Sequence, residues 1–227
     1  MNLLPAYSRL PPWMRCPEVA RSWRQLARRR DTLALKRAFD LVGAAYLIPL
    51  TLPVVGAAAL AIRLTSPGPV LFRQRRVTAG GRLFTIYKLR TMAMGSGTAL
   101  AAAGDRRVTS VGRVLRRSRL DELPQLWNVL RGEMSFVGPR PELPCYVSRY
   151  RPWMLPALLV PAGITCPASL CFRKEEEVLA LGDRETLYLE EILPAKMAYN
   201  CQYVENLSVK GDIRILLRTA RMVLFPR

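Results

Sequence analysis

The sequence predicts a mainly helical α/β protein in which an apolar membrane segment and amphipathic helices surround a small core that contains a β-hairpin. Three observations support this class. Residues 41–62 contain no charged side chain. Residues 18–37 and 211–227 carry apolar side chains at helical spacing, with arginines between them. Residues 70–92 contain two runs rich in β-branched, aromatic and aliphatic residues around a Gly-Gly pair.

Composition limits the kinds of chemistry that are available. The chain has 227 residues, enough for one domain plus an anchor, and a net charge of +18, which calls for an anionic partner. A membrane, a nucleic acid or a phosphate-rich substrate would fit. Five cysteines without a Cys-x-x-Cys pair, and no histidine, argue against a zinc site and a disulfide framework. Acid–base or nucleophilic work therefore falls to Asp, Glu, Lys, Tyr, Ser or Cys.

Both ends of the chain are basic and amphipathic. Residues 1–37 form a basic N-terminal extension without the apolar core of a signal peptide, and residues 1–17 are rich in Pro and Arg and predicted to be irregular. The helix expected at 18–37 would lie on an anionic phospholipid surface or be an ordinary solvated helix. The helix expected at 211–227 would likewise be interfacial or pack on the core.

The apolar segment has two interpretations. Twenty-two uncharged residues would reach about 33 Å, enough to span a bilayer core. Pro49 and Pro53 interrupt it, however, and each removes a backbone donor. Both flanks are strongly basic, and a single crossing cannot place two basic flanks in the cytosol. A re-entrant helix–break–helix hairpin over residues 38–64, broken at these prolines, satisfies both observations, and a kinked spanning helix is the alternative.

The next part of the chain is strongly basic. Residues 63–120 hold thirteen Lys or Arg and one acid. In the hairpin expected at 70–92, Lys88 and Arg90 alternate onto one face of the second strand. Residues 93–106 are predicted to be a flexible loop, and residues 109–119 a short basic helix.

A pair of carboxylates follows this basic stretch. Asp121 and Glu122 precede an apolar stripe at helical spacing and a stiff Gly-Pro-Arg-Pro loop at 138–141. In isolation, Asp121 is expected to be the N-cap of a helix, with Pro124 tolerated in its first turn. The alternative is chemistry on a phosphorylated substrate, with the carboxylates as nucleophile or metal ligand and the cations holding phosphate.

The chain resembles the bacterial sugar transferase family, the monotopic polyprenyl-phosphate phosphoglycosyl transferases, over residues 36–219. The 121–142 block is the most specific part of this resemblance. The motifs that carry it are KRAFD (36–40), SPGPVLFRQRRV (66–77), FTIYKLRTM (84–92), RRSRLDELPQLWNVLRGEMSFVGPRPE (116–142), PAGIT (161–165) and YVENLS (203–208).

The resemblance implies an enzyme that transfers a sugar-1-phosphate from a UDP-sugar to undecaprenyl phosphate. It releases UMP, depends on Mg²⁺, forms a covalent aspartyl intermediate, and performs the first membrane step in the synthesis of an exported glycan. Its implied place is the cytoplasmic face of the bacterial inner membrane, held by anionic phospholipid and a monotopic hairpin. A catalytic domain would occupy residues 65–227. The transferred sugar, and whether the enzyme acts as a monomer or a homodimer, stay open.

The resemblance also implies roles for individual residues. Asp121 matches the nucleophile, and Glu122 matches the acid that binds Mg²⁺. Arg140 and Pro141 match a phosphate-binding Pro-Arg-Pro motif, and Arg116 matches a basic residue before the carboxylates. Lys88 and Arg90, in the basic strand, are expected to bind substrate.

Three positions depart from the family pattern. Leu52 stands where a serine often precedes the breaking proline, with Thr51 as a candidate substitute. Residues 166–177 replace a Gly-Trp-Ala-Gln continuation, and Asn200 replaces a common acid. A membrane-tethered nucleic-acid-binding protein is the alternative function, because the charge suits a phosphate backbone. It explains neither the apolar segment nor the acidic pair, and no nucleic-acid-binding motif appears, so no nucleic-acid partner is expected.

Overall fold

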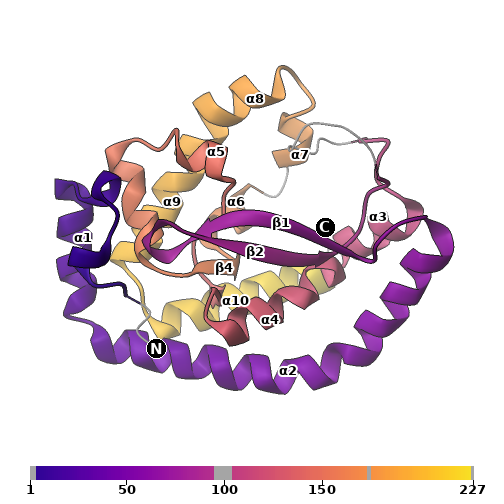
Figure 1. Ribbon diagram of the computed structural model, residues 1–227, viewed down its shortest axis with the longest axis horizontal. Helices are drawn as coiled ribbons and strands as arrows, with labels where there is room; N and C mark the ends of the chain where they lie inside the picture. The colour runs from indigo at the N-terminus through magenta and orange to yellow at the C-terminus, as the bar shows by residue number, and fades with distance from the viewer. Residues whose placement is uncertain (1–3, 95–103, 173–174, 226–227) are drawn as a thin grey trace.

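The computed structural model describes residues 4–94, 104–172 and 175–225, and the chain is mainly helical with two small sheets (Figure 1). The first half contains η1 (Tyr7–Arg9), η2 (Pro12–Met14), α1 (Pro17–Ala27), α2 (Arg30–Thr65), β1 (Leu71–Thr78), η3 (Ala79–Gly81), β2 (Arg82–Leu89) and α3 (Ser110–Arg117). The second half contains η4 (Leu120–Gln125), α4 (Leu126–Arg131), β3 (Met134–Val137), α5 (Pro144–Val147), η5 (Pro152–Leu159), β4 (Ala162–Thr165), α6 (Pro167–Cys171), α7 (Glu175–Val178), α8 (Arg184–Leu187), the π-helical turn η6 (Tyr188–Ile192), α9 (Leu193–Glu205) and α10 (Val209–Leu224).

The helix predicted over residues 18–37 is two helices. α1 ends at Ala27, and α2 begins at Arg30 and continues through the apolar segment. Val19 and Leu26 of α1 are buried in the main core, and α1 packs against η5 and α9. The apolar face of α1 is therefore covered by protein, as in an ordinary packed helix.

The break predicted at the two prolines of α2 is a bend inside one continuous helix. Pro49 and Pro53 both lie within α2, which curves along its length in Figure 1. The Thr51 hydroxyl donates to the carbonyls of Leu47 (2.7 Å) and Ile48 (3.2 Å), a side-chain bond that favours bending. Thr51 thus makes hydrogen bonds within the helix, one residue before Leu52, the position at which the family pattern often has serine.

Both ends of α2 are attached to the same globular body. Near the start, Asp40 accepts hydrogen bonds from the Ser135 hydroxyl and the Phe136 amide, each at 3.0 Å. Near the end, Ile62 is buried against β2 and α3. Between these anchors many large apolar side chains stay exposed. They are Leu41, Val42, Tyr46, Leu50, Leu52, Val54 and Leu60. By length and composition α2 is long and apolar enough to cross a membrane.

The β-hairpin predicted at 70–92 is confirmed. β1 and β2 pair antiparallel from Leu71 opposite Leu89 to Thr78 opposite Arg82. Gly80 and Gly81 have φ values of 70° and 71°, which side chains other than glycine rarely adopt, so the pair allows the tight reversal. Of the loop predicted at 93–106, residues 95–103 lie outside the described part of the chain.

The second sheet joins two motifs that are distant in the sequence. β3 and β4 pair parallel, with Met134 opposite Ala162 and Val137 opposite Thr165. The Val137 carbonyl, next to the Gly-Pro-Arg-Pro loop, accepts from Lys36 Nζ (2.8 Å) and from the Tyr203 hydroxyl (3.2 Å). Both donors also contact Asp212 of α10. This buried network therefore ties α2, α9 and α10 to the strand that leads into the loop.

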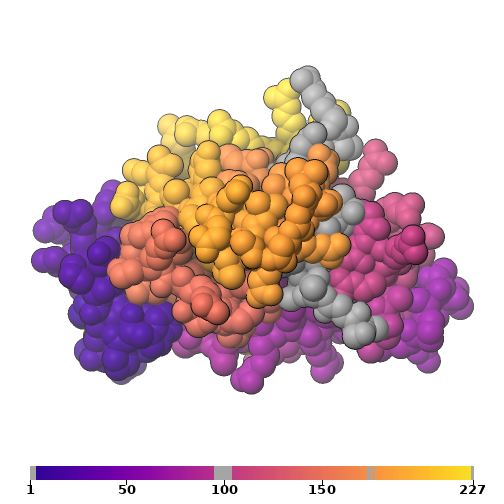
Figure 2. Space-filling view, turned by 90° about the horizontal axis from the view of Figure 1, so that it is seen from above, coloured from indigo at the N-terminus to yellow at the C-terminus, as the bar shows by residue number. Residues whose placement is uncertain are grey.

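The helices expected at 109–119 and 211–227 are present as α3 and α10. In α10, Ile215 and Leu216 pack on the core, whereas Ile213, Leu217 and Leu224 are exposed. In Figure 1, α2, α4 and α10 lie in the lower part of the molecule, with α8 at the top. Figure 2, seen from above, shows the face opposite α2, and the orange segment that carries α7 and α8 covers the middle of that face.

Candidate active site

The two adjacent carboxylates lie in a short 3₁₀ turn. Asp121 and Glu122 belong to η4, and the α-helix that follows begins only at Leu126. Pro124 lies inside η4 and has no amide to donate, so it adds no hydrogen bond to this turn. The prediction that Asp121 is a helix N-cap is therefore wrong. No cap hydrogen bond starts η4, and the Asp121 Oδ1 atom is buried without a hydrogen-bond partner.

The environment of Asp121 makes its carboxylate unusually basic. Its side chain is buried, with 8% of the residue exposed. Burial, with repulsion from Glu122, raises the pKa of Asp121 to about 6, against the opposing charges of Lys88, Arg116 and Arg119. A buried carboxylate oxygen without a hydrogen-bond partner costs stability, and this one persists within a cationic cluster. Such a group is a candidate nucleophile.

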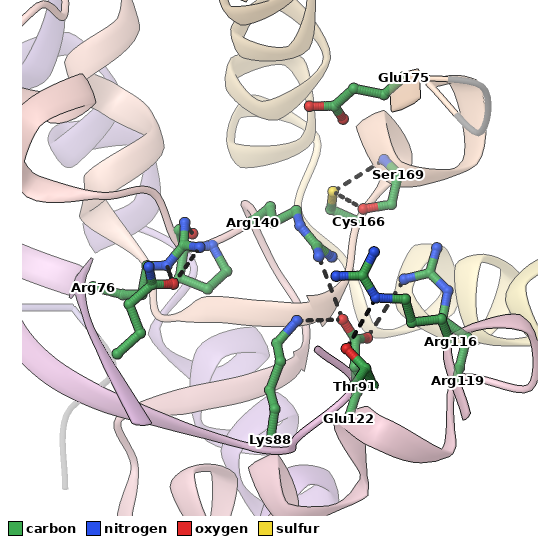
Figure 3. Close-up of polar contacts among 12 residues, drawn as sticks. Arg76, Lys88, Thr91, Arg116, Arg119, Glu122, Arg140, Cys166, Ser169 and Glu175 are labelled. Atoms are coloured by element: carbon green, nitrogen blue, oxygen red, sulfur yellow. Dashed lines mark hydrogen bonds and ion pairs between the residues drawn. The ribbon is translucent and has the colours of Figure 1, made fainter. Parts of the chain in front are cut away.

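Glu122 is surrounded by three cations that come from different elements (Figure 3). Its Oε1 lies 2.8 Å from Lys88 Nζ of β2 and 3.3 Å from Arg140 Nη2 of the 138–141 loop. Its Oε2 lies 3.5 Å from Arg119 Nη1. Although burial alone would raise it, Lys88, Arg140 and Arg119 together hold the pKa of Glu122 well below its usual range. Three converging cations also form a site that could bind phosphate.

Arg140 is placed by a close approach of two backbone segments. The Gly138 amide donates to the Thr165 carbonyl (3.1 Å), and the Gly163 amide donates to the Pro139 carbonyl (2.9 Å). A Cβ atom at either glycine would collide with backbone atoms of the opposite segment. The Gly-Pro-Arg-Pro and Pro-Ala-Gly-Ile-Thr motifs therefore need glycine where they meet. The result is a stiff loop that presents the Arg140 guanidinium to Glu122.

The structure brings together most of the residues predicted for the site. Lys88 and Arg140 contact Glu122, and Arg116 extends toward the same group while its Nε donates to the Thr91 hydroxyl at 3.0 Å (Figure 3). The Pro141 carbonyl accepts a hydrogen bond from Arg76 Nη1 at 3.1 Å, so the backbone of Pro141 links the 138–141 loop to β1.

Arg90 has a different location. Its guanidinium is buried and donates to Ser66 and to the Pro67 carbonyl, at the exit of α2. It follows Lys88 at the alternate position, just past the end of β2, but its guanidinium holds the exit of α2 and, among the described residues, forms no hydrogen bond or ion pair with Asp121 or Glu122. We therefore leave it out of the proposed phosphate site. The structure adds Arg119, for which the only sequence signal was its place in the basic run before Asp121.

In the described part of the chain, this site offers a divalent cation only two protein carboxylates, those of Asp121 and Glu122. No group of three or more acidic or cysteine residues gathers within residues 4–94, 104–172 and 175–225. Mg²⁺ usually binds one or two protein carboxylates and completes its shell with water and substrate phosphates. Glu122 beside the unpartnered oxygen of Asp121 meets that requirement.

We expect the isosteric change Asp121→Asn to stabilise the fold at neutral pH. Because the folded-state pKa is raised, the contribution of Asp121 to stability is fully present below its ordinary pKa of 3.8 and is lost as the pH rises through about 6. Asparagine does not titrate, so the variant should gain roughly 1–3 kcal/mol near pH 7.5 and about a third of that near pH 4.5. Thermal unfolding in detergent with a chelator, at both pH values, measures this difference.

The exposed Asp31→Asn change is the matched control for loss of one acid, and it should alter stability little at either pH. An Asp121→Asn variant that is less stable than the parent near pH 7.5, or equally displaced at both pH values, would contradict the buried, unpartnered state of this carboxylate.

Comparison with known proteins identifies the family. The bacterial sugar transferase family model matches residues 31–226, and the chain belongs to this family. A UDP-glucose:undecaprenyl-phosphate glucose-1-phosphate transferase of Caulobacter vibrioides is 41% identical over 203 residues, which cover 83% of this chain and 69% of that protein. A UDP-N-acetylgalactosamine-undecaprenyl-phosphate N-acetylgalactosaminephosphotransferase of Aeromonas hydrophila is 37% identical, and the match covers 84% of this chain and 44% of that protein.

A third relative has a length closer to that of this chain. The exopolysaccharide production protein PSS of Rhizobium leguminosarum is 37% identical over 196 residues, covering 82% of this chain and 94% of that protein. The predicted family resemblance is thus confirmed, and the longer relatives contain sequence that this chain does not match.

Proposed function

We propose that this protein transfers a sugar-1-phosphate from a UDP-sugar to undecaprenyl phosphate and releases UMP, as the first membrane step in making an exported glycan. The names of the relatives support the substrate class. The observation that carries the proposed mechanism is the unpartnered oxygen of Asp121 beside a carboxylate held by three cations. Those cations would hold the diphosphate of the donor while Asp121 attacks it.

The proposed reaction has two displacements at one phosphorus atom. First, an Asp121 carboxylate oxygen bonds to the phosphorus that carries the sugar, the bond from that phosphorus to the bridging oxygen breaks, and UMP leaves with the electron pair. Then an oxygen of undecaprenyl phosphate attacks the same phosphorus and displaces the carboxylate. The two phosphate substrates need not occupy the site together, which limits the negative charge to be neutralised.

The residues of the site have distinct roles in this scheme. Lys88 and Arg140 would exchange part of their contact with Glu122 for contact with the donor phosphates, and Arg116 and Arg119 would add charge from the opposite side. Mg²⁺ held by Glu122 would neutralise phosphate charge so that an anionic nucleophile can approach. The raised pKa of Asp121 makes its ionised form more basic and a better nucleophile.

The direct test uses purified protein, undecaprenyl phosphate, Mg²⁺ and a panel of UDP-sugars, with release of UMP followed for each donor. Incubation with the accepted donor alone should add the mass of one sugar phosphate to Asp121 in the intact protein. If turnover is fast and no adduct forms, or the adduct maps to another residue, the covalent mechanism is overturned. If no UDP-sugar yields UMP or lipid-linked product, the proposed activity itself is overturned.

The membrane arrangement that we propose is a re-entrant segment on the cytoplasmic face of the inner membrane. Both ends of α2 pack on one globular body, while its apolar middle is exposed. A body with a buried charge network and a strongly basic surface stays in water, so it cannot hold both ends of a helix that crosses the bilayer. The exposed apolar side chains of α10 would lie at the same interface.

Cysteine labelling tests this topology. Leu35 and Leu64 are exposed near the two ends of the apolar segment, so Leu35→Cys and Leu64→Cys are introduced separately into a variant whose five native cysteines are replaced. In spheroplasts, a membrane-impermeant maleimide should label neither site, and after lysis it should label both. Labelling of one site alone in intact spheroplasts would show a spanning helix and overturn the re-entrant arrangement.

A further inference from the structure

The segment that follows β4 brings a carboxylate to the second side of Arg140. Residues 166–177 depart from the family pattern, and within them α6 ends at Cys171 and α7 begins with Glu175. Figure 3 shows Glu175 beyond the end of Arg140, on the side away from Lys88. The charge of Glu122 makes the largest contribution to raising the pKa of Arg140, and the charges of Glu175 and Glu142 raise it further.

A buried lysine holds Glu175 in place. Lys196 Nζ of α9 lies 3.2 Å from Glu175 Oε1 and 3.3 Å from its Oε2, and 3.6 Å from Glu142 Oε1. The Tyr188 hydroxyl lies 3.4 Å from the same nitrogen. The side chains of Lys196 and Glu142 are 4% and 5% exposed, whereas that of Glu175 is 25% exposed. Glu175 is therefore the member of this cluster that a ligand can reach.

The charge of Glu175 determines which part of a donor it can face. A carboxylate repels phosphate, so beside a phosphate-binding arginine it is unfavourable unless it meets an uncharged part of the substrate. A carboxylate has about four lone-pair sites, and the contact with Lys196 leaves some of them free to accept hydrogen bonds. The uncharged, donor-rich parts of a UDP-sugar are the hydroxyl groups of its rings, and acidic side chains bind ring hydroxyls in other nucleotide sites.

We propose that Glu175, oriented by Lys196, accepts hydrogen bonds from ring hydroxyls of the donor and so helps to select it. This inference rests on the proposed function of the neighbouring site. The hydroxyls belong either to the pyranose or to the ribose. Lys196 positions the carboxylate, and Glu142 keeps the lysine paired, so Glu175, which lies in a segment that departs from the family pattern, has a role in recognition.

The test is the steady-state kinetics of Glu175→Gln with the accepted UDP-sugar. This change keeps the shape and leaves Lys196 paired with Glu142, so the fold should be retained. Loss of hydrogen bonds to a charged acceptor should raise the donor KM roughly 10- to 100-fold, with a smaller change in kcat. Glu175→Asp keeps the charge but has a shorter side chain, so its donor KM should lie between that of the parent and that of Glu175→Gln. The exposed Glu190→Gln change is the matched control and should match the parent.

Inhibition by UMP separates the two sources of hydroxyls. If Glu175 binds the ribose, Glu175→Gln should weaken UMP inhibition by the same factor as it raises the donor KM. If Glu175 binds the pyranose, UMP inhibition should be the same in the parent and in Glu175→Gln. With a deoxy-sugar donor that lacks the bound hydroxyl, the two proteins should then have the same donor KM. Unchanged KM and unchanged UMP inhibition in both Glu175 variants would overturn the inference. The proposed function would survive that result as long as the parent is active and Asp121→Asn is not.

Discussion

Replacement of Asp121 by asparagine is expected to reduce sugar-phosphate transfer by roughly 10³-fold or more, because the amide cannot form the bond to phosphorus on which both displacements depend. Asparagine has nearly the same shape, and the contacts of Glu122 with Lys88, Arg119 and Arg140 stay in place. The variant should therefore fold, bind membranes and still bind the donor. The rate of UMP release and the sugar-phosphate adduct should both be lost.

The pH dependence of the parent enzyme adds a second measurement. Protonated Asp121 cannot attack, so the rate of adduct formation with donor alone should fall as the pH drops through about 6. Asp31→Asn should keep the parent rate and profile. Full activity in Asp121→Asn would refute the proposed nucleophile, and an unchanged rate well below pH 6 would refute the raised pKa as a property of the free enzyme.

Replacement of Arg140 by alanine should lower kcat/KM roughly 10²- to 10³-fold, the usual effect of removing one preorganised group that stabilises developing charge. The guanidinium is held by the stiff loop at 138–141, so little entropy is lost when it binds phosphate. Arg140→Lys should recover only part of the loss, because an ammonium group keeps the charge but not the planar pair of donors. UMP release at varied donor concentration gives kcat and KM separately.

The matched control for Arg140 is Arg149→Ala, an exposed arginine whose side chain forms no hydrogen bond or ion pair with the described residues. It removes the same charge and should leave kcat/KM near the parent value. In Arg140→Ala, Glu122 keeps Lys88 and Arg119, so the fold should be retained. Parent-like kinetics in Arg140→Ala would exclude this residue from phosphate binding.

Local patterns predicted several elements well, because periodicity and turn chemistry act over short stretches of chain. The two strands around Gly80 and Gly81 form the expected hairpin, and the basic helix and the final amphipathic helix occur near their expected positions. The prediction that Asp121 caps an α-helix was wrong, because Leu120–Gln125 form a 3₁₀ turn and the α-helix begins only at Leu126. The pattern at 18–37 did not reveal the interruption between Ala27 and Arg30.

The site was predicted in part. The motif around Asp121, Glu122 and Arg140 identified residues that the structure brings together, and Lys88 joins them from the hairpin. Alternation along the strand also selected Arg90, but its guanidinium binds the exit of α2 instead. The pairing of Lys196 with Glu175 had no signal in the sequence, since neither residue belongs to a recognisable motif.

The sequence by itself determined the apolar segment, the hairpin, the family and the carboxylate pair, because each follows from composition, spacing or a contiguous motif. Only the tertiary structure decided which cations surround Glu122, that the Oδ1 atom of Asp121 is buried without a hydrogen bond, and that the apolar face of α1 is covered by protein. Such facts depend on contacts between distant parts of the chain, as between Lys36 and Asp212. The energies of these contacts come from burial and charge at close range, which no local window of sequence contains.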